Sequence, residues 1–228
     1  MRVPLSQPRS RSAPLQTDTH SLLVNSSNFV SATLYEKLSF NFIHDITGVA
    51  GIMRAPFVMV VNPSFSAKTF PEFIAYVKAN PAKINFASSG IGTVPHMCGE
   101  MIKIMAGVDM VHVPYRGAPP ALTDLFGGRV QVFFDVTSSS IENIAARRLR
   151  ALAVTTATRF EALPDIPAVG EFLPGYEASS VTGIGAPKNT PAEIVDKLNG
   201  QINSILAQGR AASRSARTHT TPPLLDST

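Results

Sequence analysis

Short apolar strands alternate with amphipathic helices through residues 70–156, and this alternation constrains the fold more than any other feature of the sequence. Helical spacing of apolar residues predicts helices over 70–81, 95–108, 118–128 and 138–148. The intervening segments 83–89, 109–115, 129–135 and 149–156 are typical of strands. Strands linked by helices form right-handed crossovers, so the segment predicts an α/β fold whose mainly parallel sheet has helices on both faces.

Within this block, the helix over 95–108 places four apolar side chains at helical spacing. We expect Met97, Met101, Ile104 and Met105 to face the core.

Three of the predicted strands are followed by small, polar loops, with the sequences SSGIGT, YRGAPP and DVTSSS. The carboxyl ends of parallel strands open on one edge of a sheet, where α/β folds bind their ligands. Helices begin at these loops, and the first turn of a helix offers unpaired N–H groups and partial positive charge. The sequence therefore predicts an anion site at this edge.

Flanking segments indicate a second lobe. Apolar strands are expected at 21–27, 56–63 and 179–187, followed by a capped helix over 190–206. Because these pieces lie before and after the central block, we expect the chain to cross between lobes twice. The predicted division is a disordered tail at 1–20, a first lobe from 21–62 and 173–207, a second lobe at 63–172 and a disordered tail at 208–228.

Charge and cysteine content exclude several classes of protein. The chain has 20 basic and 16 acidic residues, and the two tails together hold six of the basic and two of the acidic ones. The remaining body has 14 of each and is neutral, which argues against a nucleic-acid partner. The single cysteine excludes an internal disulfide and a multi-cysteine metal site. We expect no metal and no cofactor.

Enzymatic motifs are weak in this sequence. A dinucleotide fingerprint would need a glycine where Pro95 stands. His96 and Cys98 lie two residues apart on a predicted helix, so their side chains point to different faces. His96 is still placed to donate to a ligand oxygen from the first helical turn.

Two charged residues near the loops have alternative roles. Arg116 either grips a carboxylate through its planar fork or braces its own loop against backbone carbonyls. Asp135 would repel an anion, so we expect it to orient Arg116 or a neighbouring loop.

The loops resemble those of a known family. The stretches SSGIGTVPHMCGEM, VHVPYRGAPPALTDLFGGRVQVFFD, LRALAVTT and GIGAPKNTPAEIVDKLN are similar, in consistent order, to the substrate-binding proteins of tripartite tricarboxylate transporters, the Bug or TctC-like family. The resemblance implies a two-lobed periplasmic-binding-protein fold, type II-like, with parallel or mixed sheets. The candidate ligand-binding residues are Ser26, Ser27, Ser88, Ser89, Gly90, Gly92, Thr93, His96, Tyr115, Arg116, Gly117 and Asp135.

The resemblance also implies a function. Members of this family are monomeric extracytoplasmic receptors that bind a small carboxylate, such as a di- or tricarboxylate or an amino acid, and deliver it to membrane permease subunits. The implied location is periplasmic, although the first 20 residues lack the apolar core of a signal peptide. Family members also begin with a further strand and loop, so we expect this chain to be truncated at both ends with an incomplete first lobe. Two alternatives remain: an α/β enzyme acting on a small acid through His96, and a non-functional remnant.

Overall fold

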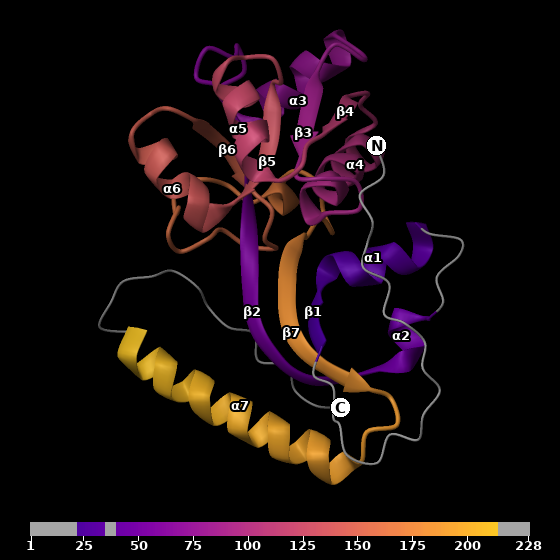
Figure 1. Ribbon diagram of the computed structural model, residues 1–228. Coiled ribbons are helices and arrows are strands. Elements are labelled where there is room, and N and C mark those ends of the chain that lie inside the picture. Colours follow the sequence, from indigo (N-terminus) through magenta and orange to yellow (C-terminus); the bar gives the residue numbers. More distant parts are fainter. Residues whose placement is uncertain (1–21, 35–39, 214–228) are drawn as a thin grey trace.

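The computed structural model describes residues 22–34 and 40–213, which form two lobes joined by long strands (Figure 1). The helices are α1 (Ser26–Leu34), α2 (Phe42–Asp45), α3 (Phe70–Ala79), α4 (Val94–Ala106), α5 (Ala118–Phe126), α6 (Thr137–Ala145) and α7 (Ala192–Ser213), with a 3-10 turn at Val169–Glu171. The strands are β1 (Leu22–Asn25), β2 (Ile46–Val61), β3 (Asn85–Ser88), β4 (Val111–Pro114), β5 (Val132–Val136), β6 (Arg150–Val154) and β7 (Ser179–Pro187).

The larger lobe contains a five-stranded mixed sheet in the order β6-β2-β5-β3-β4. Strand β3 pairs in parallel with β4 and β5, as the strand–helix alternation predicted. Strand β2 enters between β5 and β6 and runs antiparallel to both. The sheet is therefore mixed, because β2 comes from the other lobe and not from a helical crossover.

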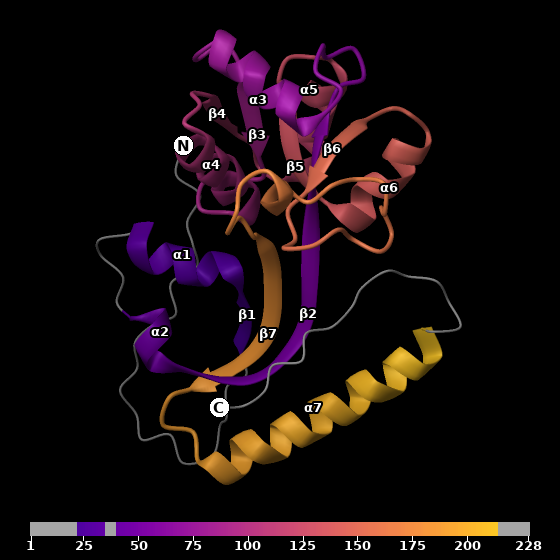
Figure 2. The same ribbon diagram turned by 180° about the vertical axis from the view of Figure 1, so that it is seen from behind.

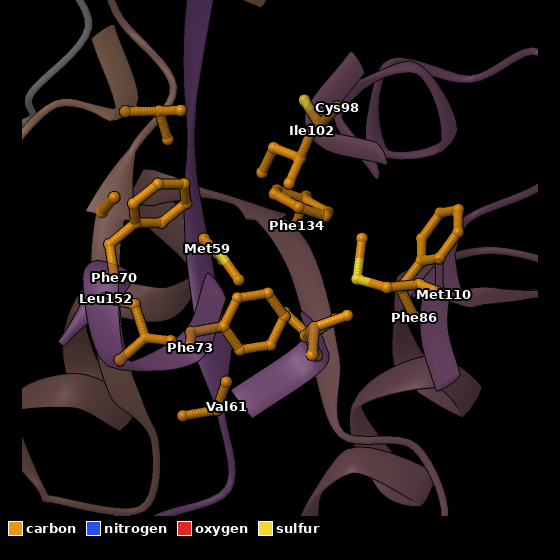
Figure 3. Close-up of a cluster of buried hydrophobic side chains, with 14 of the residues drawn as sticks. Met59, Val61, Phe70, Phe73, Phe86, Cys98, Ile102, Met110, Phe134 and Leu152 are labelled. Atoms are coloured by element: carbon orange, nitrogen blue, oxygen red, sulfur yellow. The ribbon is translucent and has the colours of Figure 1, made fainter. Parts of the chain in front are cut away.

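Alternate residues of each strand face opposite helical layers. Met59 and Val61 of β2 pack with α3 and α4, whereas Val58 and Val60 pack with α5 and β6 residues. Figure 3 shows the first of these two clusters, with the aromatic rings of α3 beside β2. Helix α3 starts where expected, because Thr69 Oγ1 accepts a hydrogen bond from Glu72 N–H and Pro71 occupies the first turn.

The buried face of α4 differs in part from the predicted one, although Met101 packs against the core as expected. Ile104 is 80% exposed and Met105 is 39% exposed, whereas Cys98 and Ile102 are fully buried. The reason is Gly99, which lets the helix lie close over a ring of β3: an added Cβ there would lie 2.2 Å from Phe86 Cε2. Because of this close approach, the side of α4 that carries Cys98, Gly99 and Ile102 faces the sheet. Cys98 acts as a small apolar residue, as expected, and burial raises the pKa of its thiol to about 12.

The smaller lobe is an antiparallel sheet in the order β1-β7-β2. Its ladder between β2 and β7 runs from Ile46↔Pro187 to Pro56↔Ser179, and the next residue, Phe57, already pairs with β5. One continuous strand thus serves both sheets. The changeover between lobes lies inside β2, and not at residue 62 where the predicted boundary stood, because a strand can exchange partners without ending.

A buried threonine forms hydrogen bonds to both chain segments that pass between the lobes. Thr155 follows β6 and is fully buried. Its hydroxyl accepts from Phe57 N–H at 3.2 Å and donates to the Ala178 carbonyl at 2.7 Å. Its own N–H and carbonyl bond to Phe57 O and Ala178 N, at 2.9 and 2.8 Å. Thr155 therefore binds both segments that pass between the lobes, β2 at Phe57 and the chain before β7 at Ala178.

Helix α7 covers the smaller sheet, and Asn199 Nδ2 donates to Val49 O of β2 at 2.6 Å. The helix continues through residues 208–213, which lie within the predicted C-terminal tail. The remaining tail residues, 1–20 and 214–228, lie outside the described part of the chain.

Replacing Thr155 with Val is expected to lower the free energy of unfolding by about 1–3 kcal/mol, because it leaves the buried N–H of Phe57 and the partly buried carbonyl of Ala178 without their hydroxyl partner. Urea denaturation measures the change. The matched control is Thr156→Val, whose hydroxyl bonds to Thr158 O near solvent and whose loss is expected to change stability by about 0.5 kcal/mol or less. Equal effects of the two variants would contradict the role of Thr155.

Candidate functional site

The three predicted loops lie side by side at one edge of the larger sheet. Strands β3, β4 and β5 are neighbours, and all three run opposite to β2, which enters from the smaller lobe. Their carboxyl ends therefore face that lobe. Tyr115 N–H donates to Ser88 O at 2.9 Å, which joins the loops after β3 and β4.

The loop over residues 88–93 satisfies most of its own polar groups. Thr93 Oγ1–H donates to Gly90 O at 2.7 Å, and Ser88 Oγ–H donates to the same carbonyl at 3.0 Å. Ser88 is fully buried, and its Oγ also accepts from Gly90 N–H at 3.2 Å. The hydroxyl hydrogens of Ser88 and Thr93 are thus donated within the loop and hold it in shape.

Other donors of the loop stay unengaged. The Ser89 hydroxyl and the N–H groups of Ile91 and Val94 make no hydrogen bond to another described residue. Gly90 and Gly92 have φ angles of 138° and 77°, a region that favours glycine and lets the backbone expose these groups. The loop therefore retains a hydroxyl and N–H groups at the start of α4, which suit an anion.

The loop after β4 is joined to helix α5 by Tyr115. Tyr115 O–H donates to Asp124 Oδ2 at 2.7 Å, and Arg129 binds the other oxygen of the same carboxylate at 2.9 Å. Burial, followed by the bond to Asp124, raises the pKa of Tyr115 to about 12. Tyr115 thus ties the loop to α5, which Gly117 begins with a φ of 109°.

Arg116, between these two residues, is exposed and makes no hydrogen bond or ion pair to any described residue. No contact supports the bracing role that the sequence left open. Its guanidinium is available to an anion.

Asp135 lies at the end of β5 and is 2% exposed. Its Oδ2 accepts from Ser140 Oγ–H at 2.7 Å. Burial raises the pKa of this carboxyl, and the bond from Ser140 opposes the rise. Asp135 thus binds the first turn of α6, and it makes no hydrogen bond or ion pair to Arg116 among the described residues.

Residues of the smaller lobe meet this edge through α1 (Figure 2). Ser26 Oγ accepts from Val181 N–H of β7 at 2.8 Å, and Ser27 N–H donates to Asn25 Oδ1 at 3.0 Å. At the other end of α1, Leu34 lies against the loop: a Cβ added to Gly92 would lie 2.6 Å from Leu34 Cδ1. The two lobes are therefore in contact at the loop.

Sequence reasoning missed a cavity at the crossing of the lobes. A space of about 250 Å³ is lined in part by Arg54, Glu177, Ser179 and Thr156. Arg54 forms an ion pair with Glu177, and its Nε donates to Ser179 Oγ at 2.6 Å. The signal for this cavity in the sequence was Arg54, a charged residue within the otherwise apolar segment that forms β2. A second space of about 370 Å³ lies in the smaller lobe against β2, β7 and α7. The loops after β3, β4 and β5 line neither.

Among residues 22–34 and 40–213 there is no group of three or more histidine, cysteine or acidic side chains arranged for a metal ion. Within the same residues, no helix combines the length and apolar character needed to cross a membrane.

Substituting Gly92 with Ala is expected to loosen α1, because the added methyl group meets Leu34. The matched control is Gly107→Ala, which shares a positive φ, 61°, but has no atom within 4 Å of the added Cβ. Both variants carry a left-handed backbone cost of about 1–2 kcal/mol. Hydrogen exchange of residues 26–34 is expected to rise only in Gly92→Ala. Similar exchange in both variants would contradict the contact.

Residues 7–216 match the family described as the tripartite tricarboxylate transporter family receptor, TctC. The chain is 36% identical over 198 residues to the UPF0065 protein in the tcbD-tcbE intergenic region of Pseudomonas sp. (strain P51), covering 86% of this chain and 59% of that protein. It spans 57–60% of the length of three such curated relatives.

Solved structures share the fold. R. palustris Rpa4515 with adipate superposes with a TM-score of 0.76 at 31% identity, covering 89% of this chain and 68% of that one. MatC from Rhodopseudomonas palustris with bound malate superposes with a TM-score of 0.73 at 28% identity, covering 85% of this chain and 67% of that one. These similarities confirm the predicted two-lobed binding-protein fold. The chain belongs to the TctC family of tripartite tricarboxylate transporter receptors.

Proposed function

We propose that this chain is a solute receptor that binds a small di- or tricarboxylate, or an amino acid, at the edge formed by the loops after β3 and β4. The observation that carries the proposal is the family match over residues 7–216, together with solved relatives described with adipate and malate. The receptor would act outside the cytoplasmic membrane, in the periplasm, as a monomer that passes its ligand to permease subunits.

The local chemistry supports a carboxylate ligand. Arg116 is exposed and unpaired among the described residues, and the unengaged donors of Ser89, Ile91 and Val94 lie on the adjoining loop. A guanidinium can donate twice to one carboxylate, and N–H groups at a helix start stabilise negative charge. Gly90 approaches the neighbouring loop closely, with an added Cβ 3.6 Å from Tyr115 O, so both sets of donors serve one region.

An enzymatic role for His96 has less support. Its Nδ1 accepts from Gly92 N–H at 3.2 Å, so this nitrogen is occupied by the loop and is not directed at a substrate. The proposal is therefore a binding protein that leaves its ligand chemically unchanged.

Adipate and malate are expected to raise the melting temperature of the chain and to be recovered unchanged by mass spectrometry. Arg116→Ala is expected to weaken binding about 10- to 150-fold in calorimetry, the loss of one charge-assisted interaction. The matched control is Arg148→Ala, an exposed arginine at the opposite end of the sheet, which is expected to keep the original affinity. Consumption of either acid would support the enzyme, and absence of binding at millimolar concentration would support the remnant.

A further inference from the structure

Two histidines stack behind the loop over residues 88–93. The ring centroids of His96 on α4 and His112 on β4 are 4.0 Å apart, with 20° between the ring planes. Phe86 of β3 continues the stack, 4.8 Å from His112. The three rings come from three different elements, so the stack joins α4 to the two strands whose loops form the candidate site.

His112 supports one side of the loop. Its Nε2 lies 2.7 Å from Ser88 Oγ. Since the Ser88 hydroxyl hydrogen is donated to Gly90 O, a consistent network has Nε2–H of His112 donating to Ser88 Oγ.

His96 supports the other side. Its Nδ1 accepts from Gly92 N–H at 3.2 Å, which requires that Nδ1 carries no proton. The proton of the neutral ring is then on Nε2, which points toward Glu100 Oε1 at 3.9 Å. The loop is thus held from both ends by neutral rings.

Charged groups near the two histidines shift the pKa values of the rings in opposite directions. On α4, Glu100 favours the charged form of each ring, and Lys103, which lies 3.1 Å from Glu100 and over the Phe86 ring, opposes it. The neighbouring segments of β3 and of α1 contribute no charged side chain. Burial lowers the pKa of His96 and, with the neighbouring His96, lowers that of His112 to about 4. Because both pKa values lie below the ordinary 6.5, the neutral stack persists below that pH and is lost only as the pH falls through the lowered pKa values.

We propose that His96 is a positioning residue that holds the loop over residues 88–93 in its binding shape while neutral, and releases the loop when Nδ1 is protonated. Protonation places an N–H opposite Gly92 N–H, so an attractive contact becomes a repulsive one. The loop then loses its anchor at the start of α4. The consequence for ligand affinity rests on the proposed function, whereas the release of the loop does not.

The test uses nuclear magnetic resonance of the whole chain without ligand, between pH 7.5 and 4.5. We expect the His96 ring to have its proton on Nε2 at pH 7.5, and the Gly92 amide signal to shift with the same midpoint, below 6.5, as the His96 ring. His96→Asn offers an amide oxygen in place of Nδ1, an acceptor that does not titrate, and is expected to abolish the shift of Gly92. His96→Phe keeps a ring in the stack without the acceptor and is expected to leave Gly92 in its acid-form position at all pH values.

The affinity for adipate, measured as a function of pH, tests the consequence for binding. In the parent chain, affinity is expected to fall, between pH 7.5 and a pH below the midpoint of the His96 titration, by about fivefold more than in His96→Asn, the effect of one hydrogen bond. Titration of adipate itself cancels in the ratio. A Gly92 signal that does not follow His96, or equal pH profiles of parent and His96→Asn, would overturn the proposal. Failure of adipate to bind at any pH would overturn the proposed function instead, and the Gly92 titration would still decide the role of His96.

Discussion

The hydrogen bonds of Thr155 connect the parts on which the rest of the structure depends. This residue bonds both to Phe57, where β2 enters the larger sheet, and to Ala178, just before β7 begins in the smaller sheet. Strand β2 belongs to both sheets, so its position sets the register of β5 and β6 in the larger sheet and of β7 in the smaller one. A buried hydroxyl with all its partners satisfied makes this junction specific, since any shift of either strand would leave polar groups unpaired.

The candidate site follows from this junction. Because β2 runs antiparallel to its neighbours, the carboxyl ends of β3, β4 and β5 must face the smaller lobe. The loop after β3 uses Ser88, Thr93 and His96 to fix its own backbone, which leaves few donors toward the outside. Such a loop is ordered before the ligand arrives, and binding then requires less loss of conformational entropy.

Local patterns in the sequence predicted the helices and strands of residues 70–156 and their converging loops, because periodicity and turn residues depend on near neighbours. They did not predict α1, α2 or residues 46–55 of β2. They failed where distant residues decide. The buried face of α4 depends on how closely Gly99 approaches Phe86, and the changeover within β2 depends on partners far along the chain. Ser88 and Tyr115 have the residue types of ligand donors, yet His112 and Asp124 engage them. Thr155 carried no signal, since its partners lie near residues 57 and 178.

The central claim is that a carboxylate is bound by the loops after β3 and β4, between the two lobes. Hydrogen exchange of the backbone amides, measured with and without malate, tests it most directly. The account predicts that added malate protects the amides of Ser89, Ile91, Val94 and Arg116, whose N–H groups make no hydrogen bond to another described residue, while residues 57–61 of β2 keep their exchange rates. Protection confined to the cavity around Arg54 and Glu177, with unchanged exchange at residues 89–94, would contradict it.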